Sequence, residues 1–220
     1  MRFLKPNRKL NLKYIIGEIL LLFIGINLAI WFNNWNTSKK INEDKKIAIS
    51  KIMDEIGNNK LEVDSVIISN RQILKAYKEY KKYYDGSTSL IKMTPKQYRL
   101  LKIEHPDFFR TKDSTKLDNG LFRYNGTTYI NLEITTLTDI AWKTTTTLNV
   151  SNEFNYDCLY ELESMYNLQR IVQNEINKSA NALQKRELEE LIHILEFLEQ
   201  LGMQLQESYK TMLNNIKNCS

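Results

Sequence analysis

Two side chains that could bind a metal lie three residues apart in a strongly helical segment. Glu190 and His193 have the i, i+3 spacing that di-metal sites in helical bundles use. Such a site needs two of these pairs and two further glutamates, whereas the other histidine, His105, has Lys102 in the matching place. We therefore expect Glu190 and His193 to be solvated helix surface, and we predict no metal or other cofactor.

The chain has two cysteines, Cys158 and Cys219. We expect Cys158 to be a small core residue and Cys219 to lie in a frayed end. Two alternatives stay open in an oxidising compartment: a disulfide between them, or a link from Cys219 to another chain. No nucleophile elbow, phosphate-binding glycine loop, zinc-protease motif or Cys-x-x-Cys pair occurs, so we predict that the protein is not an enzyme.

A single carboxylate, Glu18, interrupts an otherwise uncharged apolar segment at residues 14–35. As a helix this segment is about 33 Å long, enough to cross a hydrocarbon core of about 30 Å. Tyr14 begins it and Trp31 and Trp35 end it, as interfacial anchors do. We predict an uncleaved transmembrane helix in the lipid bilayer; a buried core helix and a cleavable signal peptide are the alternatives.

One face of this helix has the features of a helix–helix interface. Glu18, Leu22, Gly25 and Ala29 follow helical spacing, and Gly25 with Ala29 forms a small-xxx-small pair that permits close approach. Glu18 either pairs with a partner helix or handles a proton, or it extends to the headgroups or meets Lys13 or Arg8 nearby. Asn27, on another side, bonds across an interface or to its own turn. The expected partners are other membrane protein helices, in a homo- or hetero-oligomer.

The net charge of +5 is concentrated near this segment. Residues 1–35 hold five basic residues and one acid, which leaves 26 basic and 25 acidic residues for the remainder. The nearly neutral remainder argues against nucleic-acid binding. By the positive-inside rule we expect a basic cytoplasmic tail at residues 1–13, an inner-membrane span, and a periplasmic domain at residues 36–220.

Several short stretches resemble an uncharacterised family of small single-span membrane proteins from Bacteroidota, a domain family of unknown function. They are Gly17-Glu18-Ile19, Ile24-Gly25-Ile26, Leu28-Ala29, Asn33-Asn34-Trp35-Asn36 and Ala141-Trp142-Lys143. The resemblance implies a membrane anchor followed by a helical domain. It implies no catalytic residue.

After the span, residues 39–84 predict one long helix with a heptad pattern that two asparagines, Asn59 and Asn70, interrupt. Extra apolar residues beside the seam favour a bundle helix over a coiled coil. Asp85-Gly86-Ser87 is expected to end the helix. Its tyrosines, Tyr77, Tyr80 and Tyr84, either line a ligand pocket or form the edge of the core.

Residues 85–134 predict an irregular region with two local elements. A short helix is expected from Pro95 to Ile103, because proline suits a first turn and Thr94 can cap it. Asn125-Gly126 lies between β-prone residues, which predicts a β-hairpin with its turn there.

The last third of the chain predicts three helices. Residues 135–148 are ambiguous, since their threonines favour a strand while apolar spacing and the family resemblance favour a helix, which we predict. Residues 154–180 and 183–217 have strong helical periodicity. The expected fold is mainly α: a transmembrane helix, then an antiparallel bundle of long helices with one small hairpin.

Two functions are compatible with these features. The first is a membrane-anchored, non-enzymatic interaction or assembly protein, whose span packs on other membrane helices. The second is a periplasmic sensory or small-ligand-binding module that acts through a membrane partner.

Overall fold

The computed structural model describes residues 12–219 and confirms a mainly α fold. A three-stranded antiparallel sheet stands where one β-hairpin was predicted. The predicted basic tail lies largely outside the described residues. The helices are α1 (Leu12–Lys81), α2 (Pro95–Glu104), α3 (Ile140–Thr147), α4 (Tyr156–Lys185) and α5 (Leu188–Asn215). The strands are β1 (Leu90–Met93), β2 (Phe109–Lys116) and β3 (Phe122–Thr128).

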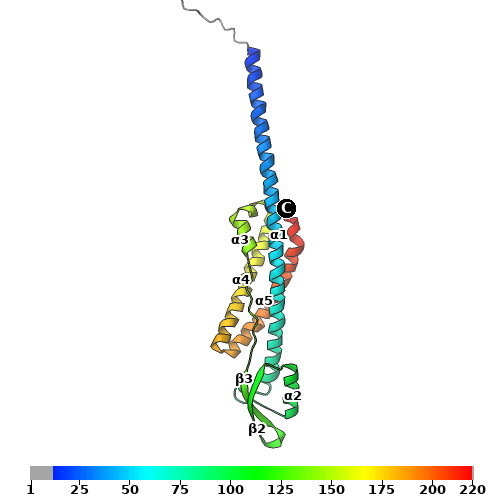
Figure 1. Ribbon diagram of the computed structural model, residues 1–220, viewed down its shortest axis with the longest axis vertical. Helices are drawn as coiled ribbons and strands as arrows, with labels where there is room; N and C mark the ends of the chain where they lie inside the picture. The colour runs from blue at the N-terminus through cyan, green and yellow to red at the C-terminus, as the bar shows by residue number, and fades with distance from the viewer. Residues whose placement is uncertain (1–11, 220) are drawn as a thin grey trace, which may run out of the picture.

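The predicted span and the predicted helix after it form a single element. Helix α1 has 70 residues and is therefore about 105 Å long (Figure 1). No proline interrupts it, and its first buried residue is Ala48. Between the span and the bundle, residues 36–44 form a largely exposed stalk of the same helix.

The bundle differs from the predicted antiparallel arrangement in one respect. Helices α1 and α4 run in the same direction, because Lys45 reaches Glu153 and Asn59 reaches Gln169. Helix α5 is antiparallel to α1, since Lys78 pairs with Glu196 and Asp64 accepts a hydrogen bond from Gln206. An extended segment, residues 129–139, carries the chain back toward the span before α4 begins (Figure 1).

The predicted heptad seam of α1 is the core face of the bundle. Helix α5 approaches this face closely at Gly202, where a Cβ atom would lie 2.8 Å from Cδ1 of Ile67. The buried seam residues are Ile52, Ile56, Asn59, Val63, Val66, Asn70, Ile73, Tyr77 and Tyr80. The bundle interpretation of residues 39–84 is therefore confirmed.

Asn70 is a polar core residue whose side chain makes no hydrogen bond within the described residues. Its side chain has no exposed surface, and within residues 12–219 neither Nδ2 nor Oδ1 has a hydrogen-bond partner. Burying an unpaired amide is costly, so Asn70→Leu is expected to raise the free energy of unfolding by about 2 kcal/mol. Asn59→Leu, which removes bonded atoms, should do the opposite. Denaturant titration of both variants checks this, and a destabilised Asn70→Leu contradicts it.

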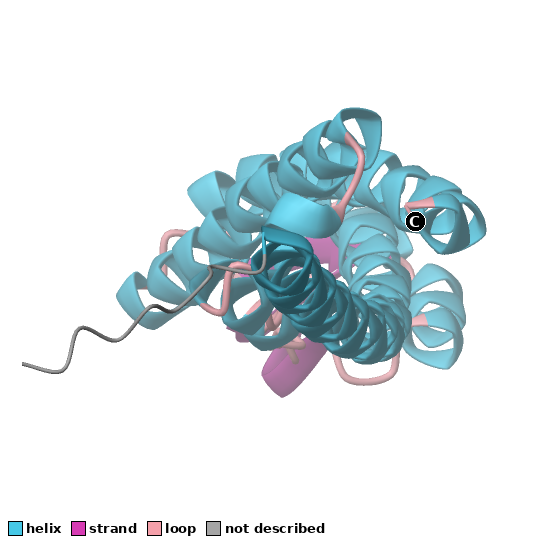
Figure 2. Cartoon of the chain, turned by 90° about the horizontal axis from the view of Figure 1, so that it is seen from above, coloured by secondary structure: helices cyan, strands magenta, loops and turns pink. Residues whose placement is uncertain are grey.

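The predicted hairpin turn at Asn125-Gly126 is wrong, because both residues lie inside β3, the central strand in the order β1-β3-β2. Strand β3 needs glycine at 126 for close approach: a Cβ atom there would overlap the Arg110 carbonyl oxygen and lie 2.7 Å from the Phe109 ring. The turn into β3 instead uses Asn119 and Gly120, which both have positive φ. The sheet caps the end of the bundle remote from the span (Figures 1 and 2).

Helix α2 has the predicted start and lies against this sheet. Thr94 accepts a hydrogen bond from the backbone N–H of Gln97, and the Gln97 side chain accepts one from the backbone N–H of Thr94. This capping box satisfies two backbone donors at the helix start. The Tyr98 ring stacks on Tyr124 of β3 with centroids 4.0 Å apart.

His105 follows α2 and faces the Tyr80 ring, with about 10% of its side chain exposed. Burial lowers the pKa of His105 below its ordinary value of 6.5. The unfolded chain then binds this proton first as the pH falls, so we expect stability to decrease below about pH 6.5. Unfolding at pH 7.5 and 5.5 should show a smaller decrease for His105→Gln than for the wild type. Equal decreases would mean that His105 does not contribute.

Cys158 is a core residue as expected, whereas the frayed end expected at Cys219 is wrong. Cys158 and Cys219 form a disulfide that joins the start of α4 to the C-terminal end, and both residues are buried. The Asn155 side chain caps α4 and also donates to the Asn218 carbonyl oxygen. The end that we expected to be frayed is therefore fixed to α4.

Several predicted helix boundaries also need correction. Helix α1 ends at Lys81 and not at residue 84, and α5 ends at Asn215 and not at residue 217. Of residues 135–148, only Ile140–Thr147 is helical, because the residues before it bond to side chains of α1 and α4. Helix α4 continues to Lys185, where Arg186 ends it in a left-handed conformation. Helix α5 then starts at Leu188.

Candidate functional site

The apolar first part of α1 has no protein neighbour in this chain. Among the described residues, α1 is the one helix long and apolar enough to cross a membrane, and none of its most apolar window is buried. Trp31 and Trp35, the predicted anchors, are 64% and 54% exposed. Tyr14 lies near the beginning of the helix. A helix this apolar and this exposed needs lipid or protein around it.

The predicted interface residues project freely from this helix. Glu18, Leu22 and Ala29 are exposed, and a Cβ atom at Gly25 would meet nothing within 4 Å. Asn27 donates to the Phe23 carbonyl oxygen at 2.7 Å, so it bonds to its own turn. The face with Gly25 and Ala29 is thus open to a partner.

A groove of about 640 Å³ lies between α1 and α3, beyond the stalk. Ala48 and Ala141 are among its small lining residues, while large apolar side chains stand at its sides. Ile47, Ile140 and Leu148 are 59%, 68% and 67% exposed. The groove therefore presents apolar surface to the outside.

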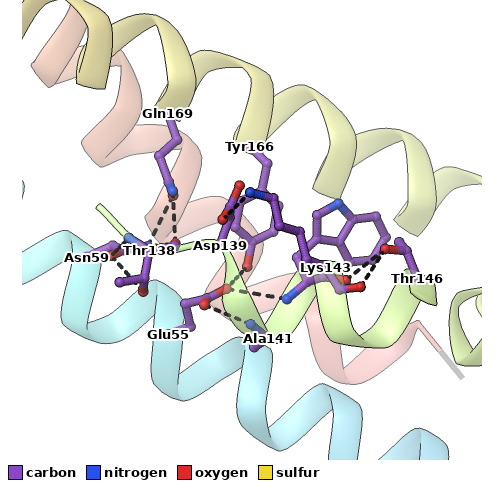
Figure 3. A network of polar contacts seen from close by, with 10 residues as sticks. Glu55, Asn59, Thr138, Asp139, Ala141, Lys143, Thr146, Tyr166 and Gln169 are labelled. Carbon is purple, nitrogen blue, oxygen red and sulfur yellow. Dashed lines mark hydrogen bonds and ion pairs between the residues drawn. The ribbon is translucent and has the colours of Figure 1, made fainter. Parts of the chain in front are cut away.

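Glu55 of α1 fixes the position of α3 (Figure 3). Its buried carboxylate accepts hydrogen bonds from the backbone N–H groups of Ala141 at 2.8 Å and Trp142 at 3.4 Å, and from the Tyr166 hydroxyl at 2.7 Å. Asp139, at the N-cap of α3, makes no capping bond of its own. A carboxylate from α1 thus caps α3 from outside, where its charge also suits the helix dipole.

Two amide side chains hold the residue before α3. Asn59 accepts from the Thr138 N–H at 2.9 Å and donates to the Thr138 carbonyl oxygen at 2.7 Å, as one more backbone segment would. Gln169 of α4 donates to the same oxygen at 2.9 Å and accepts from the Tyr209 hydroxyl at 2.8 Å. These contacts join four segments of the chain, and Figure 3 shows those of Asn59, Thr138 and Gln169.

The tyrosines of this network remain neutral donors. Burial raises the pKa of Tyr166, and its hydrogen bond to the Glu55 carboxylate raises it further. Burial likewise raises the pKa of Tyr209. The network therefore acts as a structural clamp that holds α3, one wall of the groove, in place.

The other predicted site residues do not join this groove. Tyr80 has no exposed surface and packs on Phe108 and Phe109, so it fills the core, and Tyr77 is 5% exposed. Tyr84 lies beside Tyr77, with ring centroids 6.3 Å apart. Glu190 and His193 are exposed on α5, as expected.

Sequence reasoning missed Glu55, Asn59 and Gln169 as a group. Asn59 was visible as a polar break in the heptad pattern, but Glu55 and Gln169 have the types of ordinary surface residues. Only the fold brings them together, over sequence separations of up to 111 residues.

Comparisons with protein-family models, curated proteins and solved structures find no match to this chain. The exposed span and the groove beside the stalk are therefore the features from which a function is inferred.

Proposed function

We propose that this protein is a membrane-anchored, non-enzymatic interaction or assembly protein. Its span packs on other membrane helices, and its helical domain presents a docking surface outside the membrane. The observation that carries this proposal is the apolar span, which is wholly exposed yet continuous with a core helix of the bundle. The open face at Gly25 and Ala29 supports a helical partner, because small residues let two backbones approach closely.

We further propose an inner-membrane location, with the N-terminus in the cytoplasm and residues 36–220 in the periplasm. The basic residues before the span support this orientation. The Cys158–Cys219 disulfide supports it independently, since disulfides persist in oxidising compartments such as the periplasm.

A small-ligand-binding module is the second candidate, and one cleft favours it. The cleft, of about 580 Å³, lies between the sheet and the turn that joins α4 to α5. Thr88, Ser89, Thr127 and Thr128 supply hydroxyl groups to it, and Arg186 and Glu187 supply opposite charges. A thermal-shift screen with polar metabolites distinguishes this candidate, because only a bound ligand raises the melting temperature.

The interaction proposal is tested by cross-linking the full chain in native membranes. Replacing Gly25 and Ala29 together by isoleucine should reduce the yield of cross-linked neighbours about fivefold, because bulky side chains keep partner helices apart. Gly17→Ile is the matched control, since Gly17 lies on another side of the same helix and is equally open. Unchanged cross-linking in the double variant, or no neighbour at all in the wild type, would contradict the proposal.

Glu18→Gln separates the two alternatives for this carboxylate. If Glu18 contacts a partner helix, the variant should insert normally and cross-link less. Wild-type cross-linking would mean that Glu18 extends to the headgroups.

A further inference from the structure

The open face of the span and the groove of the bundle lie on the same side of α1. Ala29 and Ile47 are 18 residues apart in one unbroken helix, which is about five full turns at 3.6 residues per turn. Leu22 and Asn58 are 36 residues apart, about ten full turns. Ile47 and Asn58 both line the groove. A helix that packs on Gly25 and Ala29 and continues outward therefore meets the edge of the groove formed by Ile47 and Asn58.

The groove has the properties of a binding site for a helix. One wall is α1 and the other is α3, which the Glu55 clamp holds in place. Small residues on both walls, Ala48 of α1 and Ala141 of α3, leave room for a backbone, and the exposed side chains of Ile47, Ile140 and Leu148 can contact it. So much exposed apolar surface in one place is typical of an interaction site.

The occupant must cross the membrane and then continue as a helix for several turns. Helix α1 of a second copy does both, since it extends from the span to Lys81 without a break. Two copies in one membrane share one orientation, so the same face of each can meet the other about a two-fold axis.

The charges of the groove also suit a second copy. Besides Glu55, which caps α3, the groove contains one carboxylate, Asp44, and one ammonium, Lys51. Neither side chain has an ion-pair partner within residues 12–219. Opposite charges on the same patch allow two identical surfaces to meet without net repulsion.

We propose that the chain forms a parallel dimer, in which α1 of each copy packs on the Gly25 and Ala29 face of the other and lies in the other's α1–α3 groove. This inference rests on the proposed function and names the partner helix. The groove thus continues the membrane interface outside the bilayer.

The test uses full-length chains in native membranes, with two different affinity tags expressed together. Ile47→Cys should give an oxidation-dependent cross-linked dimer, because a two-fold axis brings this position close to its own copy. Ile103→Cys is the control, since Ile103 is 71% exposed but lies on α2, remote from the groove. The chain without an added cysteine controls for exchange with the Cys158–Cys219 disulfide.

A second pair of variants measures the contribution of the groove. Ile47→Glu should lower co-purification of the two tags about tenfold, because a charge would enter an apolar seam, whereas Ile103→Glu should not. Ile47 is mostly exposed in the single chain, so the variant should fold, and circular dichroism checks this.

The outcomes separate this inference from the proposed function. Dimer cross-links at position 47 and loss of co-purification in Ile47→Glu support the dimer. If the two tags never co-purify but the wild type cross-links to another protein through the Gly25 face, the dimer is overturned and the interaction proposal stands. If neither a second copy nor any other neighbour is captured, both are overturned.

Discussion

Glu55→Ala is expected to lower the free energy of unfolding by about 3 kcal/mol. The wild-type carboxylate satisfies two backbone N–H groups at the start of α3 and the Tyr166 hydroxyl. In the variant, all three buried donors lose this acceptor. Each unsatisfied donor costs about 1–3 kcal/mol, and hydrogen bonds to water or local movement of the chain offset part of the total. Chemical unfolding of the full chain in detergent micelles, followed by circular dichroism, measures the change.

Glu43→Ala is the matched control for this prediction. Glu43 lies on the same helix, is exposed, and caps nothing. It should change stability by less than about 0.5 kcal/mol, as surface substitutions usually do. Hydrogen exchange adds a local readout, because the amides of Ala141 and Trp142 should exchange faster only in Glu55→Ala. A similar effect of both variants would mean that the clamp does not hold α3.

Loss of the disulfide is the second large effect. Cys158 and Cys219 close a loop across a sequence separation of 61 residues. In the chain-entropy account such a cross-link restricts the unfolded state, so replacing both cysteines by serine is expected to lower stability by about 2–4 kcal/mol. The start of α4 should also lose its attachment to the C-terminal end.

Reductant provides the internal comparison for the disulfide. Dithiothreitol should lower the melting temperature of the wild type to a value near that of the double serine variant, and it should leave the variant unchanged. Thiol alkylation of the chain from intact cells, without reduction, should label neither cysteine. A wild type that reductant does not affect would contradict a stabilising role.

Local sequence signals predicted the elements whose energetics are local. The heptad positions of α1, from Ile52 to Tyr80, are buried as the pattern required. Thr94 and Pro95 defined the start of α2, because a cap and its first turn involve only neighbouring residues. The apolar span was equally clear from composition.

The errors concern choices that long-range contacts decide. Two Asn-Gly pairs, Asn119-Gly120 and Asn125-Gly126, occur in the segment that forms the sheet. Only the packing of Gly126 against β2 shows that the turn into β3 is at Asn119-Gly120. The threonine-rich segment before α3 is extended because Asn59, Gln169 and Gln173 supply its hydrogen bonds. Periodicity within a segment contains no information about such distant partners.

Of the candidate site, the Gly25 and Ala29 face could be predicted from the sequence, whereas the groove could not, because it depends on long-range contacts. Gly25 and Ala29 stand in an apolar helix, so their small size is visible in the sequence. The groove depends on α3, whose position depends on Glu55 and Tyr166, residues 111 positions apart. The residues around Glu55 in the sequence do not distinguish it from other glutamates of the long helix, so its role as a cap for α3 could not be predicted.

Because the stalk is an unbroken part of α1, its length determines how the bundle is rotated relative to the span. Each residue inserted between Asn36 and Asp44 would raise the bundle by about 1.5 Å and turn it by about 100° relative to the span. Seven added residues would return the groove to within about 20° of its original direction about the α1 axis, whereas two would turn it to the opposite side of the axis. In the proposed membrane arrangement, the length of the stalk therefore sets both the distance of the domain from the bilayer and the direction that the groove faces. Only insertions close to whole helical turns would change this distance and keep that direction.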